Sequence, residues 1–176
     1  MSEISLQADC SRCAGLCCVA LAFDASEQFA IDKAADQPCR NLTSGGLCSV
    51  HAKLGDIGFG GCVLYTCDGA GQRVTQEVFA GKSWQDDAAL LPRMTAAFRI
   101  MRKIHQLLVL LDAAKQLPLN DMDRKELWRI KATLDCENGW TEATLVSFEQ
   151  GDVEKGAQKF LAGLRGYFPK ERNNLA

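Results

Sequence analysis

The chain has 176 residues, enough for one domain or two small ones. Hydrophobic residues make up 47% of it, so it can build a packed core without the help of a cofactor. It carries 20 Lys and Arg residues against 22 Asp and Glu residues, a formal net charge of -2, which argues against a dedicated nucleic-acid-binding surface.

No uninterrupted apolar run reaches about 18 residues, the length that would indicate a membrane-spanning helix. Residues 1–9 are polar and acidic, and they lack the basic start and the apolar stretch of a secretory signal. We therefore expect a cytoplasmic protein that binds neither a membrane nor nucleic acid. Thiols stay reduced in that compartment, so clustered cysteines indicate metal or redox chemistry rather than disulfides.

Residues 1–82 are predicted to form short, irregular elements. Short apolar runs indicate strands at 19–23, 62–66 and 74–79, and a short helix is expected over 27–35. Glycines separate these elements. This architecture is typical of modules that a bound ion holds together, because the ion replaces part of the core.

Residues 83–176 are predicted to be helical. Apolar residues recur at spacings of three and four over 93–115, which predicts one long amphipathic helix. The residues of this apolar stripe are Met94, Ala97, Phe98, Met101, Ile104, Leu108 and Leu111. Three further helices are expected, each preceded by a side chain that can cap its start. These caps are Asp121 or Asp123, Thr141 and Asp152. Gly139 is expected to end the first of these three helices, and Pro169 the last.

The predicted elements combine into a mixed α+β fold that is mostly helical. An irregular, metal-bound cysteine module over 1–82 is expected to pack against a helical bundle over 83–176. We expect one face of the long helix at 93–115 to cover the cysteine region.

Cysteines are concentrated in the first part of the chain. Eight of the nine form one group: Cys10, Cys13, Cys17, Cys18, Cys39, Cys48, Cys62 and Cys67. Cys136 lies outside this group and is expected to be a buried thiol. A free cysteine behaves as a small hydrophobe, but its chemistry usually decides why it is present. Eight thiols in one region therefore indicate metal ligation, by Zn2+ or by an iron–sulfur cluster.

The spacing of these thiols suits centres with four thiolate ligands. A closed zinc site and a [4Fe–4S] cluster each bind four protein ligands, and cysteine sulfur suits both. Cys10 and Cys13 have the C-x2-C spacing at which two thiolates share one ion. A second local pair lies at positions 62 and 67.

The adjacent pair Cys17 and Cys18 bears on the number of centres. In an extended segment neighbouring side chains point to opposite sides, so one ion would not easily bind both. Two nearby centres would then each bind one of them, and eight thiols would divide as four plus four. The alternative is a single four-thiolate centre, with the remaining cysteines buried or redox-active. The spacing does not assign thiols to centres.

Two other uses of cysteine fit the sequence less well. Disulfides need an oxidising compartment, for which the sequence holds no signal. A thioredoxin-like dithiol needs a C-x-x-C motif at the start of a helix that follows a strand. Cys10 and Cys13 follow a polar segment instead.

The cysteine elements occur in a defined order. They are C-S-R-C-A-G-L-C-C at 10–18, a lone Cys39, C-S-V-H at 48–51 and C-V-L-Y-T-C at 62–67. This order resembles the CxxCxxCC family of zinc- or iron-chelating proteins, to which flagellin lysine N-methylase is similar in its cysteine region. The opening element departs from the family, because three residues separate its second and third cysteines where the family has two. The Arg-Pro that usually follows the third element is also missing. The resemblance implies a bacterial, cytoplasmic metal-cluster protein with no agreed reaction. By analogy with the methylase it favours iron–sulfur over zinc.

Two functions remain open from the sequence. One is a non-catalytic metal-binding protein whose centre stabilises the fold, senses redox state or holds metal for delivery. The other is a metal-dependent enzyme, either methyltransferase-like or redox-active. We favour the first, because the sequence shows no acid–base constellation. His51 is expected to hydrogen-bond a sulfur rather than bind metal, and His105 to be a core or boundary residue. The sequence indicates no particular protein partner.

Overall fold

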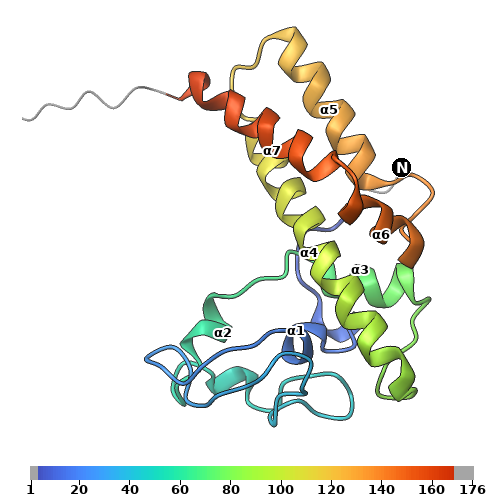
Figure 1. Cartoon of the computed structure of the whole chain (residues 1–176). Helices are drawn as coiled ribbons and strands as arrows, with labels where there is room; N and C mark the ends of the chain where they lie inside the picture. The colour runs from blue at the N-terminus through green and yellow to red at the C-terminus, as the bar shows by residue number, and fades with distance from the viewer. Residues whose placement is uncertain (1–3, 169–176) are drawn as a thin grey trace, which may run out of the picture.

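The computed structural model describes residues 4–168, and helices are the regular elements of this range (Figure 1). Residues 4–168 contain no β-sheet. Strand-like pairing in them is confined to isolated bridges between Phe23 and Lys33, Ser26 and Phe29, and Leu42 and Cys48. The expected α+β fold class is therefore wrong. The fold is helical, with long irregular connections in its first half.

Helix α4, Leu91–Ala114, is the longest element and runs through the centre of the molecule (Figure 1). Its 24 residues correspond to about 36 Å of helix. Asp87 accepts a hydrogen bond from the N–H of Ala89 and so starts the short turn η4, Ala88–Leu90, that leads into α4. Every apolar residue of the predicted stripe is buried, which confirms the long helix.

Three helices follow α4, and their N-terminal capping residues can be compared with the predicted ones. The helices are α5, Asp121–Asp135; α6, Glu142–Gln150; and α7, Val153–Gly163. Thr141 caps α6, as predicted, and the structure adds a capping box with Thr144. The cap of α5 is Asn120, whose side chain accepts a hydrogen bond from the N–H of Asp123. Asp152 precedes α7, but its side chain makes no capping hydrogen bond.

The ends of these helices also differ from expectation. Helix α5 ends before Gly139, because Cys136 already has the left-handed backbone conformation, with φ 52. Helix α7 ends at Gly163 and continues as the short turn η5, Leu164–Tyr167. Pro169, the expected end of the last helix, lies outside the described residues.

The first half contains only short helical elements. They are η1, Cys10–Arg12; α1, Leu16–Ala20; η2, His51–Lys53; α2, Gly60–Leu64; α3, Ala70–Arg73; and the π turn η3, Val74–Val78. The strands predicted at 19–23, 62–66 and 74–79 are therefore wrong. Apolar runs of four to eight residues look alike in strands and in buried helical turns, so periodicity could not separate the two.

Residues 23–33 form an open hairpin instead of the helix expected over 27–35. Phe23 and Lys33 exchange two backbone hydrogen bonds of 3.0 and 2.8 Å. The rings of Phe23 and Phe29 stack with their centroids 4.3 Å apart. Phe29 also lies against the start of α2, where an added Cβ on Gly61 would be 2.2 Å from its Cζ. Aromatic packing therefore decides the conformation of this segment.

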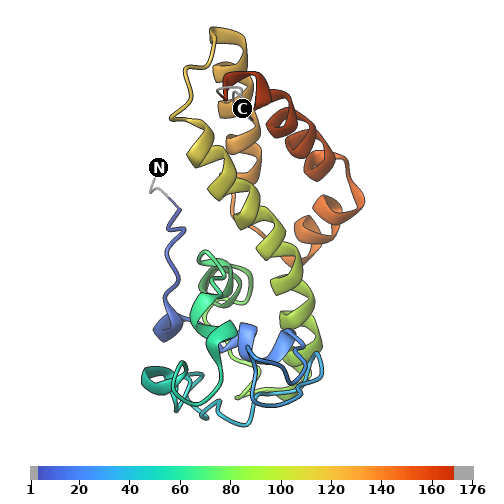
Figure 2. The same cartoon turned by 90° about the vertical axis from the view of Figure 1, so that its left-hand side faces the viewer.

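Both halves of the chain pack on α4. Helices α1 and α3 and the π turn contact it from one side, and α5, α6 and α7 contact it from the other (Figure 2). One hydrophobic core joins residues of the first half, such as Leu16 and Val74, to residues of the second, such as Leu127 and Leu145. The division at residues 82 and 83 stays a prediction, and the two regions share this core.

Candidate metal centre

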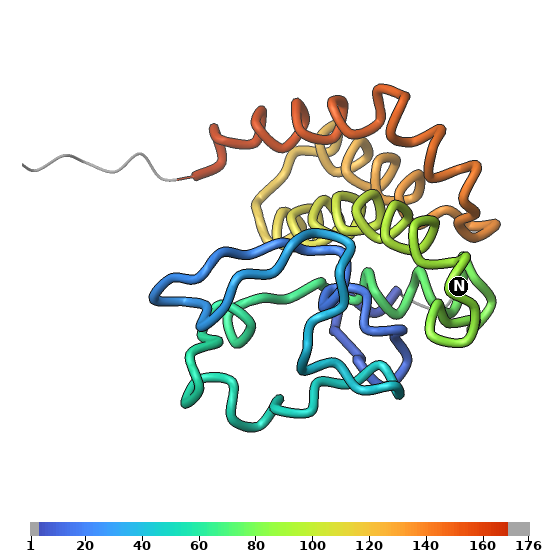
Figure 3. Tube along the Cα trace, turned by 60° about the horizontal axis from the view of Figure 1, so that its bottom comes forward, coloured from blue at the N-terminus to red at the C-terminus, as the bar shows by residue number. Residues whose placement is uncertain are grey.

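Separate stretches of chain carry the eight thiols, and the backbone segments over residues 10–67 lie on one side of α4 (Figure 3). Cys17 and Cys18 are part of α1, which packs on α4. The N–H of Cys39 donates a hydrogen bond of 2.9 Å to the carbonyl oxygen of Cys18. The bridge between Leu42 and Cys48 then closes the loop that follows. All nine cysteines of the chain are free thiols.

The thiols lie near enough to affect one another's ionisation. Burial raises the pKa of Cys10, and the charges of Cys17 and Cys67 raise it further. Burial also raises the pKa of Cys62, with further contributions from Cys39 and Cys17. Cys17 is therefore a common neighbour of thiols from both ends of the cysteine stretch.

The adjacent pair Cys17 and Cys18 points to one side, contrary to expectation. Their sulfur atoms are 3.9 Å apart. The expectation of opposite directions assumed an extended backbone, whereas both residues lie in helix α1. Consecutive side chains of a helix are rotated by about 100°, not 180°, because the helix has 3.6 residues per turn. Both sulfurs are thus available to the same site.

Cys13 follows the turn η1, and its sulfur packs against α3. An added Cβ on Gly71 would lie 2.7 Å from its sulfur, so this sulfur rests directly on the α3 backbone and needs a glycine there. Both the backbone N–H and the backbone carbonyl oxygen of the next residue, Ala14, are hydrogen-bonded. Its N–H donates to the hydroxyl of Thr75 at 3.1 Å, and its carbonyl oxygen accepts from the indole N–H of Trp84 at 2.8 Å.

The turn after Cys13 offers hydrogen-bond donors to its sulfur. Burial raises the pKa of Cys13 to about 11, and backbone hydrogen bonds from Leu16 and Gly15 oppose this rise. Gly15 has φ 67, the left-handed conformation that glycine adopts without strain, and it forms the N-terminal boundary of α1. Backbone N–H groups that point at a sulfur stabilise its thiolate form.

Lys33 is a buried cation beside the thiols, and the sequence analysis missed it. Its side chain is 7% exposed. Its ammonium group donates to three carbonyl oxygens, those of Val19, Leu21 and Ala34. Burial lowers the pKa of Lys33, and the nearby thiols of Cys39 and Cys18 raise it. No sequence signal marks this residue, because the segment around it was expected to be an ordinary helix.

Tyr65 is a second neighbour of the thiols that the sequence did not single out. Its hydroxyl group is buried and has no hydrogen-bond partner. The guanidinium carbon of Arg102, on α4, lies 5.3 Å from the centre of its ring. Burial raises the pKa of Tyr65, and the charges of Cys17 and Cys67 raise it further, so the phenol stays neutral.

The thiols do not form a ready coordination shell. Among residues 4–168, no group of three or more His, Cys, Asp or Glu side chains is arranged to hold a metal ion. The donor set is nevertheless suited to one, because soft thiolates select Zn2+ and iron–sulfur clusters. Binding would therefore require the sulfurs to move together around the ion.

Cys136 lies outside this group, whereas each histidine is hydrogen-bonded to backbone within the cysteine stretch or next to it. The thiol of Cys136 donates to the carbonyl oxygen of Gly139 at 3.2 Å. His51 is exposed in η2. His105 is fully buried in α4, which confirms the expectation of a core histidine. Its Nδ1 lies 2.5 Å from the carbonyl oxygen of Asp68, and its Nε2 has no partner.

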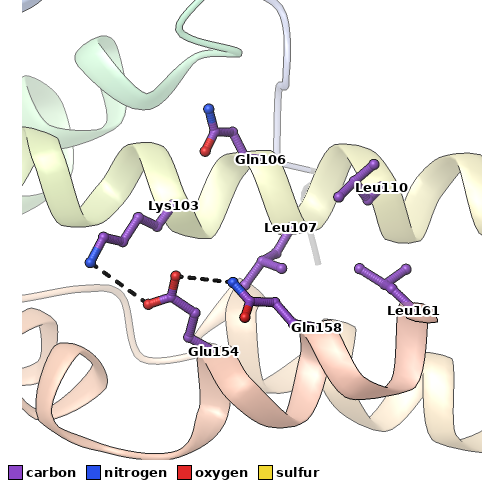
Figure 4. A pocket seen from close by; sticks show the side chains of 7 residues that line it. All are labelled: Lys103, Gln106, Leu107, Leu110, Glu154, Gln158 and Leu161. Atoms are coloured by element: carbon purple, nitrogen blue, oxygen red, sulfur yellow. Dashed lines mark hydrogen bonds and ion pairs between the residues drawn. The ribbon is translucent and has the colours of Figure 1, made fainter. Parts of the chain in front are cut away.

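The surface of residues 4–168 is hollowed near Cys13 and beside α7. One hollow, of about 240 Å³, is lined by Cys13 together with residues of η1, the π turn, the loop after it and the turn at Ser44 and Gly45. The other, of about 250 Å³, lies between α4 and α7, away from the cysteines (Figure 4). Lys103, Glu154 and Gln158 line its polar end. No helix of residues 4–168 is long and apolar enough to cross a membrane.

Comparisons with known proteins give one informative match. No family model matches the chain, and no solved structure matches it. The chain is similar to a Bacillus subtilis (strain 168) protein described as "Uncharacterized protein YybG". The two are 43% identical over 122 residues, which cover 69% of this chain and 44% of YybG. The matched region thus spans less than half of that relative.

Proposed function

We propose that this chain is a metal-binding protein whose thiolates hold Zn2+ or a [4Fe–4S] cluster. The ligands would be drawn from Cys10, Cys13, Cys17, Cys18, Cys39, Cys48, Cys62 and Cys67. One observation carries the proposal: distant parts of the chain bring eight free thiols into one region, where they are near enough to affect one another's ionisation. Core packing alone gives no reason to collect so many thiols in one place. The role would be structural, redox-sensing or metal-handling, in the cytoplasm.

A bound metal ion would allow the buried thiols of this region to lose their protons. Burial raises the pKa of Cys10, Cys13 and Cys62, so these thiols are neutral in the metal-free chain at neutral pH. Metal binds the deprotonated sulfur, and each thiol releases its proton to solvent on binding. The cation then compensates the thiolate charges that would otherwise repel one another.

His105 does not supply an accessible base for the enzyme alternative. His105 is the histidine on the helix that covers the module, but its side chain is 0% exposed and its Nδ1 is bonded to the Asp68 carbonyl oxygen. A substrate could not reach it without movement of α4. A binding role therefore needs fewer assumptions than methyl transfer or redox catalysis.

Metal and sulfide analysis of protein purified without oxygen tests the proposal. We expect tightly bound zinc in a colourless protein, or iron and acid-labile sulfide in a brown one. Cys13→Ser and Cys67→Ser should each remove about half of the bound metal or more, because a four-ligand site rarely survives the loss of one ligand. They should also expose residues 4–82 to hydrogen exchange.

Cys136→Ser is the matched control, since this thiol lies outside the group. It should keep the wild-type metal content and exchange pattern. Metal-free wild-type protein with nine free thiols, or equal mild effects of all three substitutions, would contradict the proposal.

A further inference from the structure

We infer that Cys17 and Cys18 bind the same zinc ion, an inference that rests on the zinc form of the proposed function. Their sulfurs are 3.9 Å apart in helix α1. Two thiolates on one tetrahedral zinc, with Zn–S bonds of about 2.3 Å, are separated by about 3.8 Å. A disulfide would need about 2.05 Å, roughly half the observed separation. The pair is thus already spaced for joint ligation of one ion.

Backbone contacts hold this pair in place and bring a third thiol to it. The N–H of Cys18 donates to the carbonyl oxygen of Gly15 at 3.0 Å, which fixes the first turn of α1. The carbonyl oxygen of Cys18 accepts from the N–H of Cys39 at 2.9 Å, so the backbone of Cys39 is tied to the pair. Cys39 is accordingly the third ligand that we propose for this ion, and its sulfur must move to join the pair, because no three such side chains of residues 4–168 are already arranged to hold a metal ion.

A positive charge next to Cys17 and Cys18 favours the binding of one metal ion by several thiolates. Lys33 places a buried ammonium group beside Cys17, Cys18 and Cys39. Three thiolates around a divalent ion carry a net charge of -1, and the ammonium group balances it. Lys33 reaches this position because the carbonyl oxygens of Val19 and Leu21, at the end of α1, accept its hydrogen bonds.

The binding step is an exchange of protons for metal. Each thiol loses its proton to solvent as its sulfur–metal bond forms, and the ion loses a water molecule for each bond gained. No electrons are transferred. The other thiols of the region, among them Cys10, Cys13 and Cys67, remain for a second ion, and Cys17 is a neighbour of both Cys10 and Cys13.

The test compares metal content in four full-length proteins: wild type, Cys17→Ser, Cys18→Ser and the double variant. If both sulfurs bind one ion, the two single variants and the double variant lose the same amount of metal. If each sulfur serves its own centre, the double variant loses the sum of the two single losses, and the inference is overturned. Cys136→Ser again serves as the control.

Loading the wild-type chain with cadmium-113 ions gives a second measurement that does not depend on variants folding. Proton–cadmium correlation spectra should show the β-protons of Cys17 and Cys18 coupled to one cadmium resonance. Coupling of Cys17 to a further resonance as well would also support the inference. Coupling to two different resonances with none shared would overturn it and leave metal binding intact. Absence of any bound metal would overturn both proposals.

Discussion

His105 connects α4 to the end of the cysteine stretch. Its Nδ1–H donates to the carbonyl oxygen of Asp68, the residue after Cys67. Burial and, to a smaller extent, the charge of Arg73 lower the pKa of His105, whereas the hydrogen bond to Asp68 and the charge of Glu77 raise it, and the resulting pKa is about 4. The imidazole is therefore neutral in the folded protein at neutral pH, with one ring nitrogen bonded and the other buried.

This burial makes the stability of the protein depend on pH. In the unfolded chain His105 titrates near its ordinary pKa of 6.5, but in the folded chain near 4. Between these values only the unfolded chain binds the proton, so the free energy of unfolding should fall as pH decreases from 6.5 to 4. The loss should reach about 3 kcal/mol, and the full stability should be present above pH 6.5.

Urea unfolding at several pH values measures this loss, and His105→Asn is the comparison. Asparagine can still donate to Asp68 but does not titrate, so the variant should show a flatter dependence over this range. A wild-type slope equal to that of the variant would contradict the assignment.

At this scale the sequence was informative about residue types but not about their surroundings. The core position of His105 followed from its place on the apolar helix. Lys33 and Tyr65 carried no signal, because their roles come from contacts with thiols distant in the chain. The side chains of Cys17 and Cys18 point the same way because both residues lie in helix α1. This helix has only five residues, too few for its periodicity to be recognised in the sequence.

Helix α4 supports both the cysteine module and the helical layer. Its buried stripe contacts α1 and α3 on one side and α5 to α7 on the other. Periodicity over 24 residues makes such a helix predictable, because many apolar positions agree on one face. The short elements of the first half contain too few apolar positions to reveal a helical period. They also fold around distant partners, which explains why three predicted strands and one helix were wrong.

Substitution of two leucines of α4 measures how much the packing of this helix contributes to the free energy of unfolding. Leu108 is 1% exposed, whereas Leu110 is 53% exposed. Leu108→Ala should lower the free energy of unfolding by about 2–5 kcal/mol, through lost burial and the cavity left behind. Leu110→Ala should change it by less than about 0.5 kcal/mol. Equal effects of the two substitutions in urea unfolding would contradict the packing described for α4.

On the scale of the whole molecule, a continuous core coexists with a thiol-rich surface region. The buried residues of the core around α4 come from 14–20 and 70–164, and none of them lies in the loops over 21–62. The loops over 21–62 have few regular elements, and the helices they contain are only three to five residues long. A bound ion would supply the cross-links that these loops otherwise lack. We therefore expect metal removal to loosen the loops before the helical layer.

X-ray absorption at the metal edge, on full-length protein purified without oxygen, tests the metal centre most directly. We expect the nearest neighbours of the metal to be sulfur, at about 2.3 Å, with cysteine thiolates supplying the protein ligands. A metal surrounded by oxygen or nitrogen alone, or a protein that carries no metal while its thiols remain reduced, would contradict the proposed centre.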